Sequence, residues 1–279
     1  MPGSLYVGHV KHWKLLNHMK IYLSSFAIFL LLFTGCGNPK IELQDKIDAL
    51  ILSKTQSAET KASIAELQTQ FIEAFPEDSM SQAYLENVSF YYLLVDSTAL
   101  AKKYANQYVE QYPTSENASD IKLIVGKADM KEKNYKAAIA NLESVQNEKM
   151  LSVSDMRLLA EAHLALVSDS TAEGADLHYF KYAALLEQTV GIEASIDAYS
   201  KFKQMFPNSD YGPSAMMLYA DKIERTGDAG RAVKALEDLI EQYPESEQAG
   251  TARVMLQKNL VGLTAEQQLG IILRDKSSN

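Results

Sequence analysis

The sequence has very little cysteine, tryptophan, proline and glycine. Its 279 residues include one cysteine, one tryptophan, seven prolines and 13 glycines. A single cysteine excludes a disulfide-stapled fold, and so little proline and glycine excludes collagen-like and low-complexity chains. Because 47% of the residues are hydrophobic, the chain can bury a sizeable core, and we do not expect it to be disordered as a whole.

The sequence also has fewer basic than acidic residues. There are 27 lysines and arginines against 36 aspartates and glutamates, which gives a net charge of −9. A chain with this surplus of negative charge repels polyanions, so we expect no nucleic-acid partner.

Catalytic and metal-binding motifs are missing as well. The sequence has no GxSxG, no phosphate-binding glycine loop, no HExxH and no paired cysteines. Beyond residue 35 the only histidines are His163 and His178, on different expected helices. They could form a metal or acid–base site, although a surface or seam position is the more ordinary role of an isolated histidine. We therefore expect no enzyme activity, no catalytic residue, no metal and no cofactor.

The first 35 residues have the pattern of a secretion signal. They contain no aspartate or glutamate, and the apolar run IYLSSFAIFLLLF occupies 21–33. A membrane-spanning helix needs about 20 apolar residues, so this shorter run fits a signal peptide better. We expect 1–35 to be that signal. Met19 is a candidate for the true start, because Met19, Lys20 and the run form a complete short signal by themselves.

The residues that follow the run resemble the lipobox of bacterial lipoproteins. In Phe33-Thr34-Gly35-Cys36 an apolar residue, a small residue and a glycine precede a cysteine, with Phe33 where the family usually has leucine. The resemblance implies cleavage between Gly35 and Cys36, lipidation of Cys36 and a lipidated tether over 36–40. Three acyl chains would anchor the protein stably. It also implies an outer-membrane location facing the periplasm, with the covalent lipid as the only attached group.

Beyond the tether the hydrophobic pattern is that of amphipathic helices. Ile64, Leu67 and Phe71 recur at helical spacing. Four aromatic–proline steps are expected to end helices, since proline cannot continue one: Phe75-Pro76, Tyr112-Pro113, Phe206-Pro207 and Tyr243-Pro244. The prolines are 37, 94 and 37 residues apart, and two equal spacings indicate a repeat.

Counting back from each proline gives the places of the repeat, and the pattern resembles the tetratricopeptide repeat (TPR). In the last repeat the small residues Ala220 and Ala232 and the bulky Ile223, Leu236 and Leu239 occupy its signature places. The other repeats offer the sets Ala183, Leu186, Ser195, Tyr199 and Phe202; Ser89, Tyr92, Ala101, Ala105 and Tyr108; and Gly126, Ala138, Leu142 and Val145.

This resemblance implies an all-α fold, a TPR-like α-solenoid of antiparallel helix pairs in a right-handed superhelix. We expect the repeat domain over 41–260, followed by capping helices and a tail over 247–279. The repeats are expected at about 41–76, 82–113, 119–150, 176–207 and 213–244. At 153–175 the period breaks, and a helix at about 153–167 either forms an irregular pair or shifts the stack.

The resemblance also implies a function. The chain is similar to periplasmic TPR proteins of outer-membrane β-barrel assembly and of the Tol-Pal system, which implies a lipid-anchored, non-enzymatic scaffold that binds protein partners in the cell envelope. Tyr91 and Tyr104, off the seam places, and the basic Lys102 and Lys103 are the candidate groove residues. Three alternatives remain open: a lipoprotein that captures a glycan or peptide, a cell-division coordinator, and an envelope enzyme built around His163 or His178.

Overall fold

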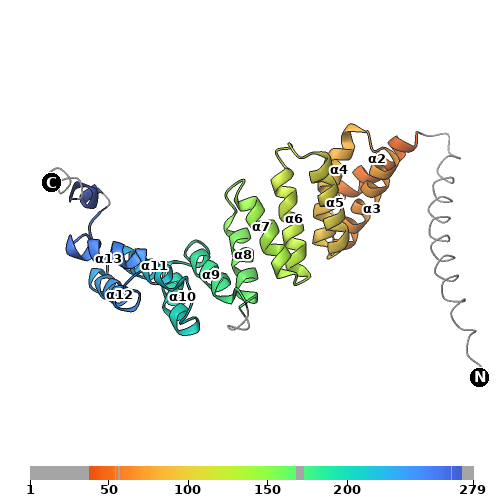
Figure 1. The fold of residues 1–279 in the computed structure, drawn as a ribbon. Coiled ribbons are helices and arrows are strands. Elements are labelled where there is room, and N and C mark those ends of the chain that lie inside the picture. The colour runs from red at the N-terminus through yellow and green to blue at the C-terminus, as the bar shows by residue number, and fades with distance from the viewer. Residues whose placement is uncertain (1–37, 54, 56, 168–172, 265, 272–279) are drawn as a thin grey trace, which may run out of the picture. The chain divides into compact units, whose positions relative to one another are not determined.

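The computed structural model describes residues 38–53, 55, 57–167, 173–264 and 266–271. Throughout these ranges the chain is helical, and none of them contains a β-strand, which confirms the expected all-α class (Figure 1). The signal segment and Cys36 lie outside the described residues. None of the helices in the described ranges is long and apolar enough to cross a membrane.

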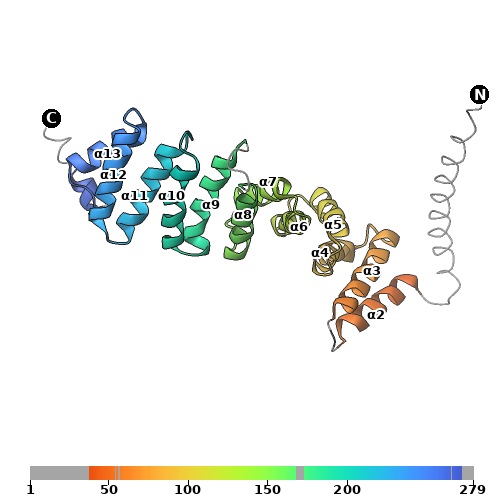
Figure 2. The same ribbon diagram turned by 90° about the horizontal axis from the view of Figure 1, so that it is seen from below.

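The helices form two compact units, divided between Val95 and Asp96. The first unit contains α2 (Pro39–Ile51), α3 (Ala58–Ala74) and α4 (Ser79–Leu94), and α3 packs against both of the others (Figure 2). In its core the rings of Phe71 and Tyr84 meet edge to face, with centroids 4.9 Å apart. The repeat expected at 82–113 spans the division, with its first helix in one unit and its second in the other.

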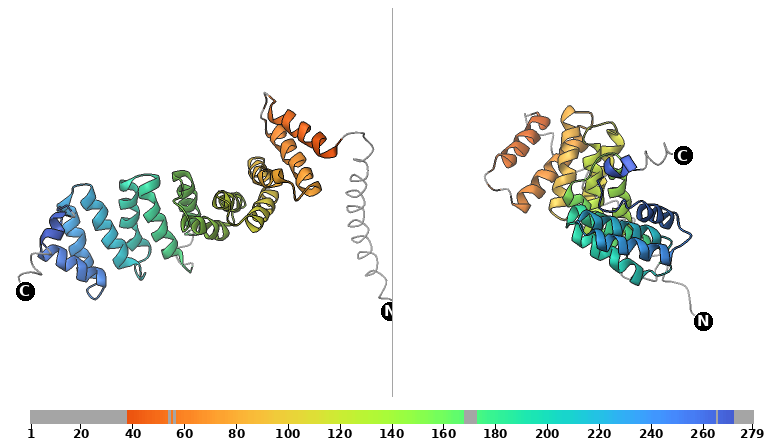
Figure 3. Two further views of the ribbon diagram at one scale, coloured as in Figure 1. Left: turned by 90° about the horizontal axis from the view of Figure 1, so that it is seen from above. Right: turned by 90° about the vertical axis from the view of Figure 1, so that its left-hand side faces the viewer.

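In the second unit each helix packs against the next one along the chain (Figures 1 and 3). Residues 266–271 are helical as well. The helices of this unit are α5 (Thr98–Gln111), α6 (Ala118–Lys131), α7 (Tyr135–Gln146), α8 (Val153–Ala165), α9 (Ala175–Thr189), α10 (Ile192–Met205), α11 (Gly212–Arg225), α12 (Ala229–Gln242) and α13 (Glu247–Gln257).

The helix at the break in the repeat period, α8, has packed partners on both sides. It lies against α7 and α9, and it also contacts α6. Between α6 and α8, Lys127 Nζ lies 2.8 Å from Asp155 Oδ1. The helices α11 and α13 have the same relation, with Gln248 Nε2 donating to Ser214 Oγ over 3.1 Å. The helix α8 therefore packs against both α6 and α7, just as α13 packs against both α11 and α12. The series of packed helices continues across the break in the repeat period.

The four aromatic residues that precede proline end their helices in one shared backbone geometry. Phe75, Tyr112, Phe206 and Tyr243 have φ from −128° to −135° and ψ from 55° to 64°. Each still donates its amide to the carbonyl four residues earlier, and its own carbonyl accepts from the amide three residues later. A residue before proline is kept out of the α region by the proline ring, which accounts for the helix end.

The residues at the repeat places form the seams between helices. In the last repeat Ala220, Ala232 and the three bulky residues are all buried. In the repeat before it, the hydroxyl of Ser195 on α10 donates to the carbonyl of Ala183 on α9 over 2.8 Å. Small residues at these places therefore let neighbouring helices approach closely, as the repeat pattern predicts.

Candidate functional site: a histidine pair among three helices

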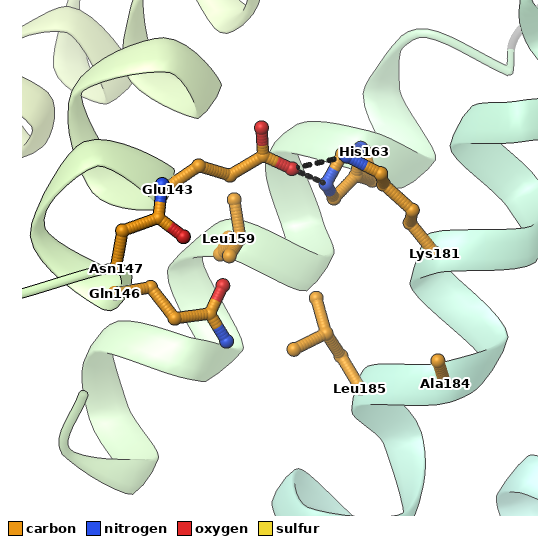
Figure 4. A pocket seen from close by; sticks show the side chains of 8 residues that line it. All are labelled: Glu143, Gln146, Asn147, Leu159, His163, Lys181, Ala184 and Leu185. Atoms are coloured by element: carbon orange, nitrogen blue, oxygen red, sulfur yellow. Dashed lines mark hydrogen bonds and ion pairs between the residues drawn. The ribbon is translucent and has the colours of Figure 1, made fainter. Parts of the chain in front are cut away.

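The most distinctive cluster of polar side chains in the described ranges lies where α7, α8 and α9 meet. Glu143 projects from α7, His163 from the last turn of α8, and His178 and Lys181 from the first half of α9. His178 and Lys181 are three residues apart and so share one face of their helix. Figure 4 shows Glu143, His163 and Lys181 converging from these three helices.

The two histidines, expected to be isolated, are in direct contact. His163 Nδ1 lies 3.0 Å from His178 Nδ1, and the ring centroids are 5.2 Å apart. His163 is only 1% exposed, whereas His178 is half-buried. For a hydrogen bond at this distance one Nδ1 must carry a proton and the other must accept it. The pair therefore carries one proton between its facing nitrogens.

A carboxylate and an ammonium complete the cluster. Glu143 Oε1 lies 3.5 Å from His163 Nε2 and 2.6 Å from Lys181 Nζ. Glu143 thus favours a proton on the far nitrogen of His163. That proton leaves His163 Nδ1 free to accept from His178.

The surroundings keep both rings uncharged near neutral pH. Burial lowers the pKa of His163 from 6.5 to about 4, opposed by Glu143 and reinforced by His178 and Lys181. Burial also lowers the pKa of His178, with Lys181 acting in the same direction. Desolvation disfavours the charged form of an imidazole, and the nearby ammonium adds to that effect.

A cleft opens beside the cluster, with a cavity volume of about 340 Å³. Leu159 of α8 and Leu185 of α9 lie at its base, and the carboxamides of Gln146 and Asn147 line the α7 side (Figure 4). Its other lining residues are Glu143, His163, Lys181 and Ala184.

The ionisable side chains that line the cleft, Glu143, His163 and Lys181, are engaged with one another. A general base needs a free nitrogen within reach of the substrate, and both ring nitrogens of His163 already face partners. The residues that line the cleft include no hydroxyl or thiol nucleophile. In the described part of the chain no three His, Cys, Asp or Glu side chains are grouped to hold a metal ion.

Two of the predicted groove residues occupy places different from those expected. Tyr104 is 3% exposed, and its ring is covered by Lys103, whose Nζ lies 4.7 Å from the ring centroid. Tyr104, named as a groove candidate because it lies off the seam places, is therefore buried in the packed face of α5. The reason is helical: Tyr104 stands three residues after Ala101 and four before Tyr108, so it shares their buried face.

Lys102 is engaged within the protein. Its Nζ lies 3.0 Å from Asp129 Oδ1 on α6 and also pairs with Glu132. These contacts raise the pKa of Lys102, chiefly through the hydrogen bond to Glu132. Lys103 is exposed, apart from its contact with Tyr104.

Tyr91 lies on α4, in the first unit, and is partly exposed. Its neighbour Phe90 is 51% exposed, with the two ring centroids 6.3 Å apart. The sequence analysis missed Phe90. Phe90 directly follows Ser89, a small residue at a seam place, and this position next to the seam is the sequence feature that indicates it.

Comparison with known families and structures matches the tetratricopeptide repeat model to residues 214–246. A comparison with curated proteins gives no match. Among solved structures, the chain is similar to the TPR2AB domain–pHSP90 complex of yeast Sti1, at 15% identity and a TM-score of 0.32. The alignment covers 78% of this chain and 96% of that one.

The matched segment contains most of α11 and all of α12, two helices that pack against each other. Its small and bulky signature residues are the ones buried between them. The chain is therefore a helical repeat protein that carries a tetratricopeptide repeat at residues 214–246.

Proposed function

We propose that the protein is a lipid-anchored, non-enzymatic scaffold of the bacterial cell envelope that binds protein partners through its helical array. The observation that carries the proposal is the tetratricopeptide repeat at 214–246, within an unbroken series of packed helices. Such repeats build extended surfaces suited to protein–protein interaction.

The membrane anchor rests on the lipobox resemblance at Phe33-Thr34-Gly35-Cys36. Metabolic labelling with a clickable fatty-acid analogue in a bacterial host tests it. We expect the chain to be labelled and the Cys36→Ser variant to be unlabelled and released from the membrane fraction. A chain that carries no label would overturn the anchor and, with it, the envelope location.

The protein-binding role is tested by photo-crosslinking in intact cells. A photoreactive amino acid at Phe90, the exposed aromatic of α4, is compared with the same amino acid at exposed Lys201 of α10. We expect position 90 to capture one or a few envelope proteins that position 201 does not. Subunits of β-barrel assembly would identify an assembly role, and Tol-Pal components would identify a cell-division role. Captured proteins that are all cytosolic, or the same at both positions, would contradict the scaffold role.

A second candidate function, capture of a small glycan or peptide, is favoured by the cleft among α7, α8 and α9. Its volume of about 340 Å³ and the paired carboxamides of Gln146 and Asn147 suit a small polar ligand. Calorimetry with short peptides and oligosaccharides distinguishes this role. Binding that is lost in the Gln146→Ala, Asn147→Ala double variant would favour capture over a scaffold.

A further inference from the structure

The contact between His163 and His178 depends on how many protons the two facing Nδ1 atoms carry. Two Nδ1 atoms 3.0 Å apart form a hydrogen bond when one carries a proton. If both rings are charged, two N–H groups point at each other and two positive charges face each other at the same distance. The contact therefore survives when one ring becomes charged, because an imidazolium Nδ1–H still donates to the neutral Nδ1 of the other ring, and it is lost only when both rings are charged.

The surroundings offer little compensation for a second proton. His163 is 1% exposed, so water cannot solvate its charge. The nearest carboxylate, Glu143, already lies 2.6 Å from the ammonium of Lys181. The charged groups that act on the pair from α7 and α9 include two lysines and two carboxylates: Lys136, Glu143, Asp176 and Lys181.

The pair also joins two helices at a place where the repeat pattern is interrupted. His163 belongs to the last turn of α8, and His178 to the first turn of α9. Around them α8 and α9 pack through buried apolar residues, including Val167 and Ala175. Loss of the histidine contact would act on this one junction, because the other neighbouring helices of the second unit have no described histidine between them.

We propose that the His163–His178 contact is a proton-sensitive clamp that holds α8 against α9 while at least one of the two rings is uncharged, and that charging of both rings releases it. Acidification then loosens the middle of the second unit and leaves the repeat at 214–246 intact. This inference rests on the geometry of α8 and α9 and does not depend on the lipid anchor or on a partner.

Hydrogen–deuterium exchange on the full-length chain at pH 7 and pH 5, corrected for intrinsic exchange rates, tests the clamp. A histidine whose pKa moves from about 4 in the closed state to about 6.5 in the open state makes opening about 20-fold more favourable at pH 5 than at pH 7. We expect a loss of protection of that order in peptides from α8 and α9. Peptides from α12 serve as the internal control and should change little.

The matched variant is His178→Asn, because the side-chain amide of asparagine places a neutral hydrogen-bonding group near the position of Nδ1. In this variant the loss of protection in α8 and α9 between pH 7 and pH 5 should be smaller than in the unaltered chain, because a charged His163 no longer faces a second charged ring, although its burial remains. Equal protection at both pH values in the unaltered chain would overturn the clamp. So would an equal loss of protection in the variant.

Two further measurements keep the proposal testable if His178→Asn does not fold. In an NMR titration of the unaltered chain, both rings should protonate below pH 6.5; a ring of the pair that protonates at or above 6.5 would overturn the clamp. The Lys181→Gln variant frees Glu143 to pair with a protonated His163, which stabilises the closed charged state, so release should occur at lower pH. Lys201→Gln on α10 should leave the release pH unchanged, and equal behaviour of the two lysine variants would contradict the proposal.

Discussion

A Cβ atom at position 126 would lie 3.0 Å from Cγ of Leu142. Gly126 belongs to α6 and Leu142 to α7, and both are buried. Contacts this close to a side-chain carbon are rare in packed proteins, so glycine is what lets these two helices approach to their observed separation. The seam of this repeat is therefore set by an absent side chain on one helix and a leucine on the other.

Substitution Gly126→Val should destabilise the second unit. The added side chain must displace the fully buried Leu142, and overpacking of this kind costs about 2 kcal/mol. Urea denaturation followed by circular dichroism measures the change. Gly250→Val in α13 is the matched control, because a Cβ at Gly250 meets no atom within 4 Å. If both variants lose the same stability, the loss reflects helix propensity and not the α6–α7 seam.

Glu187→Gln should weaken the tie between α9 and α11. Glu187 Oε2 lies 2.7 Å from Lys222 Nζ, and Oε1 lies 2.5 Å from Arg225. The first of these hydrogen bonds, then the second, lowers the pKa of Glu187. We expect the free energy of unfolding to fall by about 1–2 kcal/mol at pH 7, because the lysine side chain, 13% exposed, loses the closer of its two carboxylate partners and keeps only Asp221 at 3.4 Å.

The comparison for Glu187 is Asp238→Asn in the exposed pair of Lys234 and Asp238 on α12, whose atoms lie 2.9 Å apart. An exposed pair of this kind contributes only about 0.5 kcal/mol or less. Equal losses in the two variants would show that the burial of the α9–α11 tie has no energetic consequence.

Ser246→Ala should destabilise the last helix pair through the loss of a helix cap. The Ser246 hydroxyl accepts from the amide of Ala249 over 3.1 Å and donates to the carbonyl of Tyr243 over 2.8 Å. Removal of an N-cap hydroxyl costs about 1 kcal/mol. Thr251→Ala, on the exposed face of the same helix, should be neutral or slightly stabilising, since mid-helix threonine is a weak helix former. A melting temperature lowered equally by both changes would contradict the capping role.

The stability of the chain should fall as the pH drops from 6.5 towards 4. The folded state holds the pKa of His163 at about 4, below its unfolded value of 6.5, so the unfolded state takes up the proton first. The stabilisation is fully present above pH 6.5 and is lost progressively as the pH falls to about 4. Its full size for a shift of this magnitude is about 3 kcal/mol.

The window from pH 7 to pH 5 separates this effect from that of the carboxylates. Glu132, Glu148 and Glu187 have a pKa lowered from 4.5 by hydrogen bonds from lysine, so their contribution is lost only at lower pH. Urea denaturation at both pH values should show a larger loss in the unaltered chain than in His163→Asn, where only His178 of the pair still contributes. A slope that persists undiminished in the variant would assign the pH dependence to other groups.

Several features of the fold could be predicted from neighbouring residues alone. Each aromatic–proline step ends a helix, because the proline ring excludes the α conformation of the residue before it, and that steric rule needs no tertiary contact. The signature residues of the repeats are buried as predicted, because helical periodicity places them on one face.

The candidate site could not be predicted in the same way. His163 and His178 are 15 residues apart, and Lys181 reaches Glu143 across 38 residues and two helix junctions. No sequence period connects these side chains, and whether they meet depends on how far each helix is rotated and shifted in its packing. The burial of Tyr104, in contrast, follows from local spacing, because Tyr104 stands three residues after Ala101 and four before Tyr108 and so shares their buried face.

The sequence by itself thus determined where the helices end and which faces they bury, because backbone sterics and amphipathic periodicity act between residues close in the chain. The tertiary structure alone decided that α8, the helix at the break in the period, has α7 and α9 as partners, and that two histidines share a proton between them. Those outcomes depend on distances between helices, which only the packing of complete side chains sets.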